Sequence, residues 1–257
     1  MVAPSVDIAM STFDSSDRYS VSLRQTGTSF AAPRVSSLVA MMYQQDQRLR
    51  SWPVAVRAVL MASAVNRLQN RDGDIPEFGP QKIGGLYGLD KQIGVGGVNG
   101  QGASEIIAGD RFTDKGFFHL FQGLPASWIP DGANGAYKLN TDSVIIETAR
   151  QRARVVLTWN GDADCWFCSS APTFNAIQSD LDLEVLDGNS APLVNAAGKK
   201  IGLSLSFDNN YEVIDIPTAG LVQPLRVRVK SFGPTIRTEP FAVAVFYYDG
   251  ASAESPP

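Results

Sequence analysis

The sequence predicts an α/β segment over residues 1–110, an all-β sandwich of the jelly-roll kind over residues 111–250, and a flexible tail at 251–257. Two observations predict this order. Apolar residues recur at helical spacing in the first segment, and short apolar runs separated by Gly, Pro, Asn and Asp fill the second. A chain of 257 residues is long enough to bury a substantial core, in one large domain or two smaller ones.

In the first segment, a short strand and two helices account for most of the pattern. "VDIAMS" predicts the strand. Residues 30–45 carry apolar side chains on a broad face, which predicts a helix buried nearly all round. A second helix is expected to begin near Ser51, because Pro53 is tolerated in a first turn and "VAVRAVLMASA" continues it. The glycine-rich stretch "IGGLYGLDKQIGVGGVNGQG" predicts loops and tight turns.

The second segment is read as eight short strands. Each is a run of apolar or alternating residues bounded by turn-forming residues, and eight such runs are typical of a β-sandwich such as a jelly roll. The runs are "FFHLFQ", "YKLN", "SVIIET", "ARVVLTWN", "DLDLEVLD", "YEVIDI", "LRVRVKSF" and "FAVAVFYY".

Composition and charge narrow the classes of partner. The chain is 44% apolar and 19% charged with a net charge of −4, which is typical of a globular protein. No basic patch stands out, so we expect neither nucleic acid nor an anionic membrane as a partner. No apolar run is long enough to span a membrane. The N-terminus lacks a basic region and its apolar run is broken by Asp7, so it does not read as a signal peptide.

Two cysteines, Cys165 and Cys168, occur in the loop-like stretch "DADCWFCSS". Together with the single histidine, His119, they are too few for the four ligands of a structural zinc site. A local disulfide is the favoured interpretation, two free thiols the second, and redox or metal chemistry the least favoured.

One serine lies where a polar, glycine-led turn runs into the first predicted helix, in "QTGTSFAAPRV". A serine hydroxyl becomes a nucleophile only when a base removes its proton, and its attack on a carbonyl creates an oxyanion that needs hydrogen-bond donors. The first turn of a helix offers free backbone N–H groups and the positive end of the helix dipole. Gly27 permits a tight turn there, and Ser29 would present its Oγ to a substrate. A plain Ser/Thr cap before a core helix is the structural alternative.

The residues Gly27, Thr28, Ser29, Ala31 and Pro33 resemble the Gly-Thr-Ser-x-Ala-x-Pro motif around the active serine of subtilisin-like serine proteases. Five fixed positions arise by chance with a probability on the order of 10⁻⁴ in a chain of this length. The resemblance implies that Ser29 is the nucleophile, that its N–H is one oxyanion donor, and that Gly27 and Thr28 lie at the substrate. It also implies that the first segment is the C-terminal portion of a doubly wound catalytic domain.

The family's triad runs Asp, His, Ser along the chain. Only 28 residues precede Ser29 and none is His, while His119 follows it inside a predicted strand, where a structural or surface role is favoured. The resemblance therefore implies a secreted endopeptidase acting on proteins or peptides, present here without its Asp, His and oxyanion Asn. The missing segment would be in the same protein or supplied in trans, and this chain alone would be inactive. The alternative is a truncated, non-catalytic homologue that acts as a β-sandwich binding or structural module.

The second segment is similar to the C-terminal jelly roll of some secreted alkaline subtilisin-like proteases. The similarity rests on four stretches in matching order, Leu157–Trp159, Asp180–Leu183, Asn209–Glu212 and Phe241–Ala242. Trp159 and Phe241 are expected in the core rather than on a ligand-binding surface.

Acidic residues alternate with apolar ones along one of these strands. Asp180, Asp182 and Glu184 would share the face opposite the core. A solvated acidic face is the favoured interpretation, and a Ca²⁺ site completed by Asp187 or Asp208 is the alternative. The proposed chemistry itself requires no cofactor.

Overall fold

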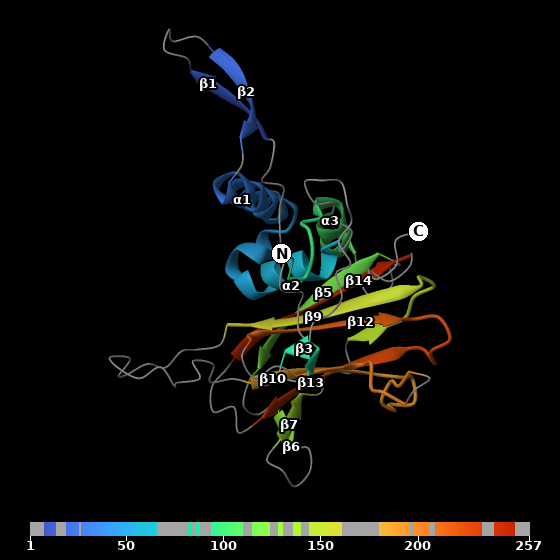
Figure 1. The fold of residues 1–257 in the computed structure, drawn as a ribbon. Coiled ribbons are helices and arrows are strands. Elements are labelled where there is room, and N and C mark those ends of the chain that lie inside the picture. The colour runs from blue at the N-terminus through green and yellow to red at the C-terminus, as the bar shows by residue number, and fades with distance from the viewer. Residues whose placement is uncertain are drawn as a thin grey trace.

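A computed structural model describes residues 8–13, 19–25, 27–65, 82–83, 86–87, 94–109, 115–123, 128–130, 136–139, 144–160, 180–195, 198–205, 209–232 and 239–249. Its body is built from a layer of helices and two antiparallel sheets (Figure 1). The helices cover one face of one sheet, which is called the first sheet below. The other face of that sheet packs against the second sheet. The chain is thus a mixed α/β protein, as the sequence predicts.

The helix layer contains α1 (Thr28–Gln45), α2 (Pro53–Ser63) and α3 (Gly100–Ala108), with a short 3₁₀ helix η1 (Gln47–Ser51) between the first two. Pro53 lies in the first turn of α2, as predicted, but the helix begins at Pro53 itself, because Ser51 ends η1. α3 was not predicted, because its start lies in the glycine-rich stretch. The Asn99 side chain caps it by accepting a hydrogen bond from the Gly102 N–H at 3.0 Å. None of the helices described here is long and apolar enough to cross a membrane.

Two small hairpins complete the N-terminal part. β1 (Ile8–Phe13) pairs with β2 (Tyr19–Gln25), and β3 (Lys82–Ile83) pairs with β4 (Leu86–Tyr87). β1 contains most of the strand predicted in "VDIAMS", whereas β2 was not predicted. The β1–β2 hairpin stands beyond the N-terminal end of α1 (Figure 1).

The expectation that α1 is buried nearly all round is wrong. Met42 is its only buried residue, and Met41 is 65% exposed. The helix is held at its C-terminal half, where Gln45 Nε2 donates to the carbonyl oxygen of Ser104 at 2.9 Å. A sequence shows which face of a helix is apolar but not which element covers it, and in the described part of the chain α1 packs mainly on α3 and η1.

The two sheets contain all eight predicted strands. The first sheet has the order β12-β9-β14-β5, and the second has the order β11-β10-β13-β7-β6, with β8 paired to β13. Two further short strands, β6 and β11, were not predicted. The bounds are β5 (Gly116–Gly123), β6 (Trp128–Pro130), β7 (Ala136–Leu139), β8 (Ile145–Ile146), β9 (Arg152–Trp159), β10 (Asp180–Leu186), β11 (Leu203–Ser204), β12 (Tyr211–Pro217), β13 (Leu225–Phe232) and β14 (Glu239–Tyr248).

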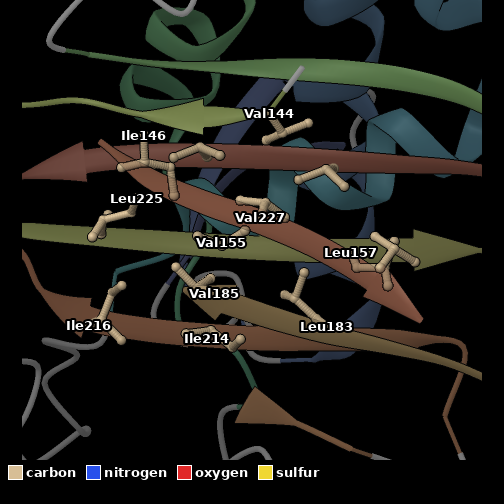
Figure 2. Close-up of a cluster of buried hydrophobic side chains, with 14 of the residues drawn as sticks. Val144, Ile146, Val155, Leu157, Leu183, Val185, Ile214, Ile216, Leu225 and Val227 are labelled. Atoms are coloured by element: carbon tan, nitrogen blue, oxygen red, sulfur yellow. The ribbon is translucent and has the colours of Figure 1, made fainter. Parts of the chain in front are cut away.

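The core between the sheets is built mainly from one side of β5, β9, β10, β12, β13 and β14 (Figure 2). On β9, Val155 and Leu157 point into it, and Leu183 of β10 and Val227 of β13 meet them from the second sheet. Trp159 is fully buried there, and so is Phe241, which confirms that both are core residues.

A second core lies between the helices and the first sheet. Val156, Ala242 and Ala244 face the helices and are fully buried against α2 and α3. The run "FAVAVF" in β14 is continuously apolar because this central strand is covered on both faces. Alanine at two helix-facing positions leaves room for α2 to lie close to the sheet.

The start of β5 is a point of close approach between the layers. Gly116 has a φ of +135°, and a Cβ added there would lie 3.1 Å from Phe246 Cα, 3.2 Å from Ile106 Cγ1 and closer still to the carbonyl oxygen of Val245. Substitution would therefore combine an unfavourable backbone conformation with a clash against β14 and α3.

We expect Gly116→Ala to lower the free energy of unfolding by about 3 kcal/mol or more. Gly198→Ala is the matched control, because Gly198 also has a positive φ (+75°) but nothing lies within 4 Å of its added Cβ. The control should cost only about 1 kcal/mol. Urea denaturation of both variants measures the difference, and equal losses would contradict the close contact.

Candidate functional site

Ser29 lies in the first turn of α1, immediately after the N-cap residue Gly27 and Thr28. The Phe30 N–H already donates to the Gly27 carbonyl oxygen at 3.0 Å. The N–H groups before it belong to the first turn, whose donors have no partner inside the helix. The first turn holds no acidic residue, so no carboxylate of its own neutralises the positive end of the helix dipole.

The side chain of Ser29 is open to solvent, as is that of Thr28. Gly27 matters for this arrangement, because a Cβ on residue 27 would lie 3.3 Å from Ser29 Oγ and 3.7 Å from the Phe30 ring. Glycine therefore leaves Ser29 Oγ the space it occupies. The hydroxyl is reachable from outside, as a nucleophile must be.

The single histidine lies on the far side of the first sheet from the helices. On β5, Phe118 and Leu120 face the helix layer, whereas Phe117 and Phe121 face the second sheet. His119 shares the side of Phe117 and Phe121 by strand alternation, and its ring centroid lies 4.4 Å from that of Phe121. A sheet thus separates the imidazole from the helix layer to which Ser29 belongs.

Three polar contacts fix α2, which packs on α3 and η1, to strand β9. Thr158 Oγ1 donates to the Val54 carbonyl oxygen at 2.6 Å, near the start of α2. Arg57 donates to the carbonyl oxygen of Trp159. Arg154 donates to the carbonyl oxygen of Ala64, the C-cap residue of α2. A cation at this end of a helix complements the negative end of its dipole.

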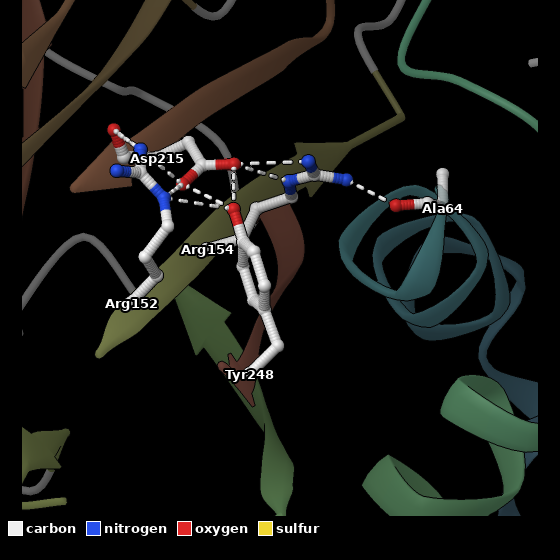
Figure 3. A network of polar contacts seen from close by, with 5 residues as sticks. All are labelled: Ala64, Arg152, Arg154, Asp215 and Tyr248. Carbon is white, nitrogen blue, oxygen red and sulfur yellow. Dashed lines mark hydrogen bonds and ion pairs between the residues drawn. The ribbon is translucent and has the colours of Figure 1, made fainter. Parts of the chain in front are cut away.

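Arg154 belongs to a network at the edge of the helix layer (Figure 3). Its guanidinium pairs with Asp215 at 2.9 Å, and Arg152 pairs with the same carboxylate at 3.0 Å. The Tyr248 hydroxyl donates to Asp215 at 2.6 Å. The Arg154 side chain is 5% exposed and that of Asp215 is 22% exposed, so this ion pair is largely shielded from water.

The sequence does not predict this network. Arg154, Asp215 and Tyr248 each look like the outward polar residue of an alternating strand. Their partners are distant in sequence: Ala64 is 90 residues from Arg154 and Asp215 is 61 residues from it. No local pattern marks such pairs.

Acidic and apolar residues alternate along strand β10 as predicted, but its acidic side chains are not exposed as predicted. Leu181 and Leu183 point into the core, and Asp182 and Glu184 face the other way, yet they are only 1% and 7% exposed. Glu184 pairs with Arg228 at 3.3 Å and with Lys230 at 3.2 Å, both on β13. The expectation of a solvated acidic face is therefore wrong for these two residues.

The Ca²⁺ alternative stays a prediction. Within the described residues, no group of three or more His, Cys, Asp or Glu side chains is placed to hold a metal ion. Asp187 accepts hydrogen bonds from the N–H groups of Asn189 and Ala191 in its own loop. Asp208 and the side chain of Asp180 lie outside the described part of the chain, and so do Cys165 and Cys168.

Asp215→Asn should lower the free energy of unfolding by about 3 kcal/mol, because it leaves the buried Arg154 guanidinium without its carboxylate. Asp249→Asn is the matched control. Asp249 pairs with Arg150 at an exposed site, so its replacement should change stability little. Urea denaturation compares them, and a loss for Asp249→Asn as large as that for Asp215→Asn would contradict the role of burial.

Deprotonation of Tyr248 should lower the free energy of unfolding at alkaline pH. Burial, and then the Asp215 charge, raise the pKa of Tyr248 from 10.0 to about 12. The unfolded chain therefore gives up this proton more readily than the folded one. The stability that Tyr248 contributes is complete below pH 10 and is lost as the pH rises to about 12.

We expect Tyr248→Phe to remove this part of the alkaline loss. Urea denaturation at intervals from pH 8 to about 12 should show wild type and variant drawing closer in stability above pH 10. Parallel stability curves across that range would contradict the raised pKa.

Comparison with known proteins adds one finding. Residues 3–96 match the model of the subtilase family, Peptidase S8. The matched residues include Gly27, Thr28 and Ser29 and end before α3. A search of curated proteins found no match to the chain. The family match relates the N-terminal part to serine proteases, and the two sheets lie outside it.

Proposed function

We propose that the chain serves a subtilase-type serine endopeptidase in which Ser29 is the nucleophile. One observation carries the proposal: within the residues that match the subtilase family, Ser29 lies exposed in the first turn of a helix. The substrates are proteins or peptides, and the reaction is hydrolysis of a peptide bond through an acyl-enzyme. The reaction uses no cofactor.

In this reaction Ser29 Oγ forms a bond to the substrate carbonyl carbon while a general base takes the hydroxyl proton. The oxyanion accepts a hydrogen bond from the Ser29 backbone N–H. The bond from carbon to the peptide nitrogen then breaks, and the amine leaves with the proton. Water releases the acid from the ester by the reverse sequence of proton transfers. Gly27 and Thr28 lie beside the substrate in this arrangement.

We propose that the base, its Asp partner and the oxyanion Asn come from a segment other than residues 1–257, in the same protein or in trans. His119 is the single histidine in the sequence, and the first sheet separates it from the helix layer. The exposed side of α1 supports such a partner, because this helix of 18 residues carries a single charged side chain, Arg34. An exposed helix surface with so little charge is typical of an interface.

We further propose that the two sheets form a jelly roll that stabilises the peptidase segment. Eight strands, β5, β7 and β9 to β14, pair in a nested order along the chain. The first pairs with the eighth (β5 with β14) and the second with the seventh (β7 with β13). The third pairs with the sixth (β9 with β12) and the fourth with the fifth (β10 with β11). An antiparallel ribbon of strands that is folded over on itself gives these pairs. Pairing of β14 with β9 and of β10 with β13 then joins the four pairs into two sheets. This order supports interlocked Greek keys. A secreted location is proposed from the family relationship.

A fluorophosphonate probe tests the role of Ser29. We expect no labelling of the chain alone, and labelling at Ser29 when a subtilase segment that carries the Asp, His and Asn is added. Ser29→Ala should abolish the labelling, whereas Ser37→Ala, at an exposed serine of the same helix, should leave it intact. Mass spectrometry of the labelled peptide identifies the residue. Absence of labelling in the complemented mixture, or labelling that survives Ser29→Ala, would contradict the proposal.

A further inference from the structure

We propose that the sheet β12-β9-β14-β5 is the template on which helices α2 and α3 fold, so that these helices and both sheets unfold as one cooperative unit. The first turn of α1, with Ser29, opens independently of that unit. The predicted boundary between residues 110 and 111 would then separate two sequence patterns, but the segments on its two sides would not fold independently.

Because of the apolar contacts between α2 and the sheet, neither can bury its apolar surface without the other. Ala55, Ala58 and Val59 of α2 are fully buried in the same cluster as Val156 and Ala244 of the sheet. Removing the helices would expose a central apolar strip of the sheet to water, and removing the sheet would expose the buried face of α2. Each exposure is unfavourable, so the two surfaces stabilise each other.

The polar contacts act along the whole length of α2. Thr158 contacts Val54 at one end and Arg154 contacts Ala64 at the other, with Arg57 reaching Trp159 between them. Thr158 is fully buried and Arg154 is 4% exposed. A partly detached helix would break these contacts while leaving the groups poorly hydrated, which favours complete docking or complete unfolding.

The first turns of α1 lack such contacts. Thr28 and Ser29 are exposed, and the first buried residue of the helix is Met42. Unwinding the turns that hold Ser29 therefore uncovers no buried side chain. Short helices without packing are marginal in water, so this end should open without disturbing the rest.

Native-state hydrogen exchange of the full chain, read by mass spectrometry, tests the proposal with reciprocal variants. Val227→Ala weakens the core between the sheets, and Val59→Ala weakens the core beneath α2. We expect Val227→Ala to accelerate the slowest amides of α2 and α3 by the same factor as those of β13, about tenfold or more. Val59→Ala should accelerate β13 likewise. Amides of residues 30–34 should exchange at unchanged rates in both variants.

Helix amides that keep their wild-type rates in Val227→Ala, while β13 accelerates, would overturn the proposal. Should either variant fail to fold, exchange of the wild-type chain at increasing urea decides instead. A shared urea dependence for the slowest amides of α2, α3 and β9 supports one unit, and separate slopes refute it. Ser29→Ala should leave all these rates unchanged, so this test succeeds or fails independently of the proposed chemistry.

Discussion

The constraint on which the structure depends is that one sheet, β12-β9-β14-β5, is covered on both faces. Alternate residues of β9 and β14 point in opposite directions, so each strand contributes to two cores at once. Every position must then be apolar or have a polar partner. This requirement explains the unbroken apolar run of β14, the alanines beneath α2 and the paired arginine in β9. It also determines where the helix layer, and through it α1, is attached.

Polar pairs at this junction do something that apolar packing does not. Apolar contacts have no direction, whereas a hydrogen bond specifies which atoms must meet. The carbonyl group at the C-terminal end of α2 lacks an intrahelical donor, and the Arg154 guanidinium supplies one. The carboxylate of Asp215 offsets the cost of burying that cation. With Thr158 at the opposite end, these contacts specify how α2 lies along β9.

Sequence patterns predicted the elements well where local periodicity decides the outcome. The eight predicted strands, the helix with Pro53 in its first turn and the serine motif could all be recognised from neighbouring residues. α3 was missed because its first turn contains two glycines, which are poor helix formers, although Asn99 caps it. Strand alternation places His119 opposite Phe118, but only the tertiary structure shows which side the helices cover. The network of Arg154 and Asp215 joins residues far apart in sequence, so no local signal predicts it.

The scarcity of charge on α1 has a consequence for handling the protein in solution. Contacts made through a helix with one charged residue, Arg34, are driven by exclusion of water rather than by attraction between ions. Added sodium chloride would screen little at such a surface. Sulfate or phosphate salts would strengthen association through it, because these ions are excluded from protein surfaces. Ionic composition therefore offers a way to adjust association through this helix without altering a residue.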